Sequence, residues 1–197
     1  MHSSPISRDK SLKLFPNSYV VLDIETTGFN PKEHEIIELS ALKAENGVII
    51  DEFSKLVKPV GYLSSYISNL TGITIDMLQN APFIKETILD FKEFCANYIV
   101  IGHNINFDLS FINTQLIKNY DIPFTNDYID TLKLARKYLP QLPSRKLGAI
   151  AEYFGLDTTG MHRGLKDCMV TNLCYQKFIQ LHSPEQHNQI NALGLKF

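Results

Sequence analysis

Two strand-like runs joined at Asn46-Gly47 constrain the fold of this chain more than any other feature. Together they form the stretch HEIIELSALKAENGVIIDEFSKLVKP, residues 34–59, which is rich in apolar side chains. Asn-Gly is the strongest short hairpin signal, because both residues readily adopt the positive φ of a two-residue turn. A shorter apolar run, YVVLDIE at residues 19–25, precedes the pair. The chain is therefore expected to open with a meander of three strands.

Helices dominate the rest of the chain and alternate with two further apolar runs. Short helical pieces are expected at residues 64–78, and a helix at residues 81–98 with Pro82 in its first turn. The runs YIVIG and FTNDYI, at residues 98–102 and 124–129, predict a fourth and a fifth strand. The later helices, with the N-caps expected for two of them, are 106–120, 130–138 (Asp130), 144–154 (Ser144) and 164–181. This order predicts an α/β fold with a mixed sheet flanked by helices.

The composition limits the class of protein. A chain of 197 residues can bury one sizeable core, so one domain is the default. No apolar run approaches the ~18 residues of a membrane span. The polar N-terminus lacks the apolar core of a signal peptide, so a cytoplasmic protein is expected. The net charge of −2 does not indicate polyanion binding, and a nucleic-acid function would need another source of positive charge.

The cysteines point to a reducing environment. Cys95, Cys168 and Cys174 are odd in number and form no CxxC pair. Reduced, buried thiols are therefore expected in place of a disulfide framework or a zinc site.

Two acids, Asp23 and Glu25, lie at the end of the first apolar run. Alternation along a strand directs both side chains to one face, with Cα atoms roughly 6.5 to 7 Å apart, while Ile24 faces the core. That gap fits a cation held between the two carboxylates. Solvent-facing acids on an edge strand are the alternative, because D-x-E alone is a weak pattern.

Three more polar residues follow at the ends of expected elements. Asp108 lies in the first turn of a helix, where the helix dipole alone tolerates an acid. His162 follows Gly160-Met161 in a loop, and Asp167 falls in the first turns of the last helix. Taken singly, His162 is more often an incidental surface residue than a functional one.

The motifs DIETTG, GHNINFD and HRGLKD, at residues 23–28, 102–108 and 162–167, together resemble those of the DnaQ-like exonucleases of the DEDDh group. The proofreading subunit of bacterial DNA polymerase III is a member of this group. The four-residue gap between His162 and Asp167 separates the group from relatives that use tyrosine. The third motif commonly has alanines where this chain has Gly164 and Cys168, which are also small. The resemblance covers roughly residues 18–180.

This resemblance implies a ribonuclease H-like fold, with a mixed five-stranded sheet in which strand 2 runs antiparallel to the others. We therefore expect a flexible N-terminal lead-in at residues 1–17, an exonuclease domain at residues 18–182 and a C-terminal tail at residues 183–197.

The resemblance also implies roles for the site residues. Asp23, Glu25, Asp108 and Asp167 would bind two divalent metal ions, Mg²⁺ or Mn²⁺, and His162 would be the general base. Four packed carboxylates need such counter-charge if they are to stay ionised. The residues that match the family's pocket for the 3'-terminal nucleotide are Thr26, Thr27, Gly28, Leu70, Thr71 and Phe107.

Some of these residues have an ordinary structural explanation as well. Leu70 and Phe107 could simply pack in the core, as apolar residues usually do. Gly28 is expected to permit a tight turn. His103, in the second motif, is expected to brace its neighbours rather than to act on the substrate.

The leading function is a metal-dependent 3'-to-5' exonuclease that releases nucleoside 5'-monophosphates from single-stranded or frayed DNA ends, in proofreading or repair. An exoribonuclease that uses the same site on RNA ends or short oligoribonucleotides stays open, because such motifs do not separate the two sugars. A nucleic-acid-binding module without activity is the third reading, and the presence of all five site residues argues against it. A DNA polymerase, or another replication or repair protein, stays open as a partner.

Overall fold

The structure is a computed structural model, and it describes residues 7–11 and 13–182. The tail expected at residues 183–197, and residues 1–6 and 12 of the expected lead-in, lie outside the described residues. The strands are β1 (Ser18–Thr26), β2 (Ile36–Glu45), β3 (Val48–Leu56), β4 (Val100–Gly102) and β5 (Tyr128–Asp130). The helices are α1 (Ser65–Thr71), α2 (Ile75–Leu78), α3 (Ile84–Cys95), α4 (Asn106–Tyr120), α5 (Thr131–Tyr138), α6 (Leu147–Tyr153) and α7 (Gly164–His182).

The strands form one mixed sheet in the order β3-β2-β1-β4-β5. β2 pairs antiparallel with β1 and with β3, whereas β4 pairs parallel with β1 and β5. Strand 2 therefore runs against the other four, as expected. The turn between β2 and β3 has positive φ at Asn46 and Gly47, which confirms the predicted hairpin.

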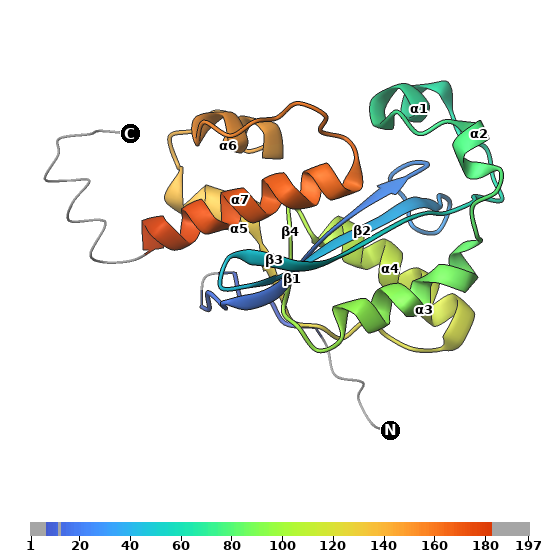
Figure 1. The fold of residues 1–197 in the computed structure, drawn as a ribbon, viewed down its shortest axis with the longest axis horizontal. Coiled ribbons are helices and arrows are strands. Elements are labelled where there is room, and N and C mark those ends of the chain that lie inside the picture. Colours follow the sequence, from blue (N-terminus) through green and yellow to red (C-terminus); the bar gives the residue numbers. More distant parts are fainter. Residues whose placement is uncertain (1–6, 12, 183–197) are drawn as a thin grey trace, which may run out of the picture.

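Helices cover both faces of this sheet (Figure 1). α3 and α4 pack on one face, where Phe91 and Phe111 meet Leu22 of β1. α5, α6 and α7 cover the other face, where Tyr19 of β1 meets Tyr175. Because side chains alternate along β1, the residues that follow Tyr19 at every second position point toward α7.

Other surface features complete the fold. The short helices α1 and α2 lie beyond one end of the sheet (Figure 1) and share a small core with Ile37 of β2.

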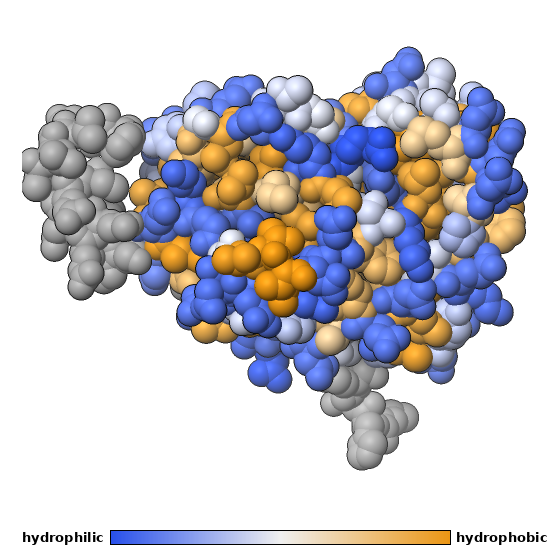
Figure 2. Space-filling view, viewed as in Figure 1, coloured by the Kyte–Doolittle hydropathy of each residue, from blue (hydrophilic) through white to orange (hydrophobic). Residues whose placement is uncertain are grey.

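On the face seen in Figure 2, hydrophobic side chains gather over β3, whose Val48 and Ile50 are exposed. Within the described residues no helix is long and apolar enough to cross a membrane. All three cysteines are buried free thiols, as predicted.

The expected position of Pro82 in the first turn of a helix is wrong. α3 begins only at Ile84, with Phe83 as its N-cap. The carbonyl of Pro82 accepts a hydrogen bond from the N–H of Lys58 at 2.8 Å, and the N–H of Phe83 donates to the carboxylate of Glu86 at 2.8 Å. These two bonds hold the chain extended up to Phe83.

The N-cap predictions have opposite outcomes. Asp130 caps α5 as predicted, since its carboxylate accepts from the N–H of Leu132 at 2.9 Å. Ser144 does not cap the next helix, because α6 begins at Leu147 with Lys146 in the N-cap position. The Ser144 hydroxyl accepts from the N–H of Lys146 at 3.5 Å and closes a local turn instead.

Part of the expected N-terminal lead-in lies against the sheet. Asp9 forms a parallel bridge with Tyr128 of β5, and Lys10 donates its N–H to the Tyr128 carbonyl at 2.8 Å. The Ser11 hydroxyl donates to the Asp9 carboxylate and accepts from the N–H of Asp130 at 2.8 Å. The described residues of this segment thus extend the pairing at the β5 edge.

Candidate active site

The first acid pair lies on β1. Asp23 and Glu25 are half-buried and point toward α7, while Ile24 between them packs in the opposite core. One carboxylate oxygen each from Asp23, Glu25 and Asp167 lie within 4.8 Å of one another. The structure therefore brings the first and third motifs together, as expected from the sequence.

Asp167 reaches β1 because the start of α7 lies very close to β2. A Cβ atom at Gly164 would lie 2.3 Å from the hydroxyl oxygen of Ser40, so the helix could not approach as closely with a side chain there. In the first turn of α7, Asp167 is buried, and its Oδ2 accepts from the N–H of His162 at 2.9 Å. Its Oδ1 is buried and has no hydrogen-bond partner among the described residues.

Asp108 approaches the same strand from the other side. It lies in the first turn of α4, directly after β4, and is only 5% exposed. Its Oδ1 accepts from the N–H of Ile24 at 3.1 Å. The second motif is therefore joined to the peptide unit between the two acids of the first.

Burial and mutual repulsion set the protonation of these acids. Burial raises the pKa of Asp23 well above its usual range, and the neighbouring Asp108 and Asp167 raise it further. Burial, with repulsion from Asp167, raises the pKa of Glu25 to about 8. Burial also raises the pKa of Asp108 to about 8 and raises that of Asp167, although hydrogen bonds oppose both shifts.

These residues fit divalent metal ions. The donors are all carboxylate oxygens, which hard cations such as Mg²⁺ and Mn²⁺ prefer. Among the described residues, the Asp167 Oδ1 atom has no hydrogen-bond partner. A buried acceptor of this kind is costly unless something satisfies it, and a cation would also relieve the repulsion that raises the four pKa values.

His162 has an unusual backbone conformation. Its φ is +67°, in the left-handed region that a non-glycine residue adopts at a cost of roughly 1–2 kcal/mol. The bond from its N–H to Asp167 holds that conformation. Its side chain is exposed to solvent.

Glu38 on β2 belongs to the site but was not predicted from the sequence. This residue is 2% exposed and lies directly opposite Glu25 in the sheet register. Its carboxylate accepts from the N–H of Gly164 at 3.0 Å and from the Arg163 guanidinium at 3.3 Å. The acid inside the apolar run EIIEL was a visible signal, because an unpaired charge is rarely buried.

The predicted nucleotide pocket begins where β1 ends. The Thr26 hydroxyl donates to the Gly28 carbonyl at 2.6 Å, and the Thr27 hydroxyl accepts from the N–H of Glu35 at 3.0 Å. Gly28 is not one of the described glycines with a positive φ. The tight turn expected there is therefore not the reason for a glycine at this position. Instead, a Cβ atom at Gly28 would lie 1.5 Å from the His34 ring.

The other predicted substrate residues differ in exposure and in the contacts that they already make. Leu70 on α1 is 42% exposed. Thr71 is buried, and its hydroxyl donates to the Ile67 carbonyl at 3.0 Å and accepts from the N–H of Ile73 at 3.1 Å. Phe107 is half-buried against Phe111, with ring centroids 5.0 Å apart.

His103 directly follows β4 and is half-buried. Its Nδ1 lies 3.0 Å from the hydroxyl of Thr131, and it also bonds the backbone of Arg145. Burial lowers the pKa of His103 to about 4. A neutral ring that joins the start of α5 to the loop before α6 is the bracing contact expected for this residue.

The chain matches an exonuclease family model and DNA polymerase III proteins over most of its length. The exonuclease family model, RNase_T, matches residues 20–175. DNA polymerase III subunit epsilon of Aquifex aeolicus (strain VF5) is 41% identical over 180 residues, which cover 91% of this chain and 89% of that protein. DNA polymerase III PolC-type of Staphylococcus aureus (strain bovine RF122 / ET3-1) is 40% identical over 177 residues, but these cover 88% of this chain and only 12% of that protein.

The fold also matches solved structures. Exonuclease I superposes with a TM-score of 0.75 at 17% identity, over 89% of this chain and 43% of that chain. At this identity the match speaks for the architecture alone. It confirms the α/β fold of the ribonuclease H-like type.

Proposed function

The chain belongs to the DnaQ-like exonuclease family, and we propose that it is a metal-dependent 3'-to-5' exonuclease. The reaction is hydrolysis of the terminal phosphodiester bond, with release of a nucleoside 5'-monophosphate. The observation that carries the proposal is the meeting of oxygens from Asp23, Glu25 and Asp167 within 4.8 Å, together with the buried Oδ1 of Asp167, which has no partner in the described part of the chain.

The metal ligands in this proposal are Asp23, Glu25, Asp108 and Asp167. When bound, two Mg²⁺ or Mn²⁺ ions would lower the pKa of an attacking water and neutralise charge at the scissile phosphate. The backbone of β1 and the N-termini of α4 and α7 hold the four carboxylates in place before substrate arrives. Preorganisation of this kind lowers the cost of reaching the transition state.

His162 is the general base in this proposal. A ring nitrogen accepts a proton from water as the water oxygen bonds to phosphorus, and the bond from phosphorus to the 3'-oxygen breaks. The departing 3'-oxygen takes a proton from solvent. An imidazole suits the first transfer because its ordinary pKa is close to neutral.

The 3'-terminal nucleotide would lie between the end of β1 and α1. We assign Thr26, Thr27 and Gly28 to its sugar and phosphate side, and Leu70, Thr71 and Phe107 to the last bases. The exposure of Leu70 supports a contact role, whereas the Thr71 hydroxyl already donates to Ile67 of α1 and accepts from Ile73. Thr71 would then contribute through its methyl group and its backbone.

The substrate we favour is a single-stranded or frayed DNA 3' end, in proofreading or repair in the cytoplasm. The names of the two polymerase III relatives support DNA and a polymerase partner. This chain spans only 12% of the PolC-type relative, so the partner belongs to the proposal. Residues 18–182 would form the exonuclease domain.

Matched digestions test this function. Labelled DNA and RNA oligonucleotides of one sequence would be incubated with EDTA-treated protein, with and without Mg²⁺ or Mn²⁺. We expect mononucleotides released from the 3' end, faster from DNA, and only with metal. Full-rate cleavage without metal, or equal degradation of a circular substrate, would refute the proposal, and faster cleavage of RNA would favour an exoribonuclease.

A further inference from the structure

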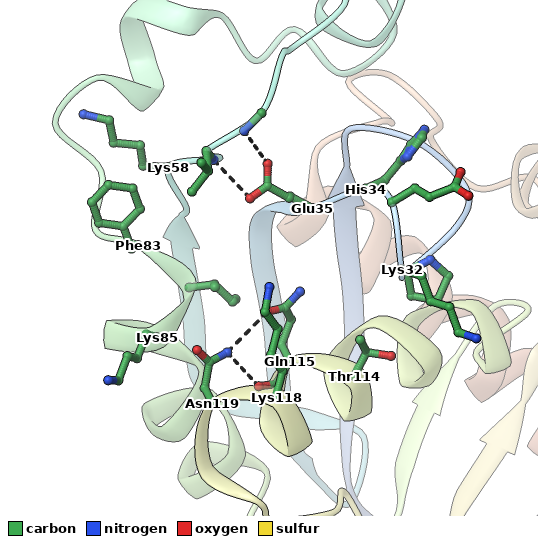
Figure 3. A pocket seen from close by; sticks show the side chains of 15 residues that line it. Lys32, His34, Glu35, Lys58, Phe83, Lys85, Thr114, Gln115, Lys118 and Asn119 are labelled. Carbon is green, nitrogen blue, oxygen red and sulfur yellow. Dashed lines mark hydrogen bonds between the residues drawn. The ribbon is translucent and has the colours of Figure 1, made fainter.

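A polar pocket lies on the α3 and α4 side of the molecule, away from the acid cluster. It has a volume of about 770 Å³, within the range of roughly 300–1,000 Å³ typical of ligand sites. Its walls come from the loop after β1, the loop after β3, the start of α3 and the outer face of α4 (Figure 3). In Figure 3 the α4 residues lie below Glu35, with Phe83 and Lys85 on one side and Lys32 on the other.

The charge of this pocket is opposite in sign to that of the whole chain. Lys32, Lys58, Lys85 and Lys118 line it against two glutamates, so its formal charge is positive, whereas the chain carries −2. One of the two, Glu35, already accepts from the N–H groups of Val60 and Gly61 at 3.0 and 2.6 Å.

Unlike five other lysines in the described part of the chain, the pocket lysines form no ion pair with a carboxylate. The ion pairs there join an aspartate to each of Lys10, Lys43, Lys55, Lys133 and Lys166. No carboxylate among the described residues forms an ion pair with any of the four pocket lysines. Lys58 donates to the Gln79 carbonyl, and the other three amino groups are available to an anion.

The pocket is joined directly to the place assigned to the 3'-terminal nucleotide. Its wall residue Glu35 exchanges two hydrogen bonds with Thr27, through the Thr27 hydroxyl at 3.0 Å and the Thr27 N–H at 2.9 Å. Its wall residue His34 packs its ring directly on Gly28. A strand with its 3'-terminal nucleotide at Thr27 and Gly28 could therefore reach this pocket with the nucleotides that precede it.

The lining suits a nucleotide chain better than a simple anion. Phe83 is 46% exposed and offers a ring on which a base can stack. Thr114, Gln115 and Asn119 of α4 add polar groups to the floor. Lysines beside an exposed aromatic ring are the usual means of binding single strands without reading their sequence.

We propose that this pocket binds the phosphate backbone of single-stranded nucleic acid, upstream of the 3'-terminal nucleotides. This inference rests on the proposed function, because it places the strand by its 3' end. It supplies the positive field that the chain as a whole lacks. The pocket would raise affinity for long strands without taking part in the chemistry.

The test compares a pocket variant with a matched control of equal charge. Lys85→Gln/Lys118→Gln removes two exposed pocket lysines, and Lys92→Gln/Lys137→Gln removes two helix lysines outside the pocket. Binding of a 20-nucleotide single strand with phosphorothioate linkages at its 3' end would be followed by fluorescence anisotropy at several salt concentrations. Hydrolysis of the p-nitrophenyl ester of thymidine 5'-monophosphate, which is too small to reach the pocket, would be measured in parallel.

We expect the pocket variant to bind the strand roughly tenfold more weakly and to lose about 1.4 from the slope of log affinity against log salt, since each phosphate contact contributes about 0.7. The control variant and ester hydrolysis should be unchanged. Equal loss of affinity in both variants, or no loss in either, would overturn the inference. If no variant or wild-type protein hydrolysed the ester, the proposed function would fail, while the binding data would still decide on the pocket.

Discussion

The carboxylate of Glu38 on β2 accepts a hydrogen bond from the backbone N–H of Gly164 at 3.0 Å, and so fastens the first residue of α7 to the sheet. Three residues further on, α7 carries Asp167. Glu38 also meets the guanidinium of Arg163, next to His162. One buried acid therefore holds the part of the third motif that lies between His162 and Asp167.

Replacement of Glu38 by alanine should weaken both the fold and the activity. The Gly164 N–H would lose its acceptor in a buried position, which costs roughly 1–3 kcal/mol in the free energy of unfolding. We expect Glu38→Ala to lower kcat on the p-nitrophenyl ester with little change in KM, because the substrate contacts stay. Glu38→Gln keeps an oxygen acceptor and should restore most of both quantities. Equal losses in the two variants would show that the charge, and not the hydrogen bond, matters.

Gly164 and Ser40 should behave as a pair. A methyl group at Gly164 would meet the Ser40 side chain at 2.3 Å, so Gly164→Ala should lower the free energy of unfolding by roughly 1–3 kcal/mol. Ser40→Gly removes the colliding atoms, and alanine is otherwise favoured over glycine in a helix by about 1 kcal/mol. The double variant should therefore recover most of the loss in denaturant unfolding. Additive losses would contradict the contact.

Stability of the metal-free protein should fall as pH rises. Acids whose pKa is raised by folding bind more protons in the folded state than in the unfolded state. The free energy of unfolding therefore falls as the pH rises. The fall should run from the ordinary carboxyl pKa of about 4 up to about 8, the value reached by Glu25 and Asp108. Denaturant unfolding in EDTA would follow it, with Glu25→Gln/Asp108→Asn as the control that flattens the curve.

Excess Mn²⁺ should reverse that trend, because ionised carboxylates bind the metal more strongly at higher pH. Metal-free wild-type protein that gained stability relative to the control variant between pH 5 and about 8 would show that these acids are not raised in pKa.

Much of the fold follows from local sequence patterns. The apolar runs and the Asn46-Gly47 turn predicted the first three strands. Asp130 predicted the start of α5, because an N-cap depends only on neighbouring residues. The helix starts predicted at Pro82 and Ser144 were wrong. A long-range contact at Pro82 and a local turn at Ser144 outweighed the preference of these residues for the start of a helix. Lys58 holds the Pro82 carbonyl from another part of the chain, which no pattern around Pro82 reveals.

In the site, too, local motifs were predicted from the sequence and long-range contacts were not. The motifs marked Asp23, Glu25, Asp108 and Asp167 because their spacing is itself the signal, and the structure brings the first motif to the second and third. The acid of Glu38 was visible inside the run EIIEL, but its role was not, because its partner, Gly164, lies 126 positions further along the chain. The lysine pocket could not be foreseen either, since its walls come from four separate segments.

In the proposed mechanism the carboxylates hold divalent metal, while His162 only moves a proton. Calorimetric titration of Mn²⁺ into wild-type protein, Asp167→Asn and His162→Ala, beside single-turnover rates, tests it most directly. We predict weaker Mn²⁺ binding in Asp167→Asn, and near wild-type binding in His162→Ala with a rate lower by roughly 10²- to 10⁴-fold. Equal loss of Mn²⁺ affinity in both variants would make the histidine a ligand, and unchanged affinity in Asp167→Asn would contradict the metal site.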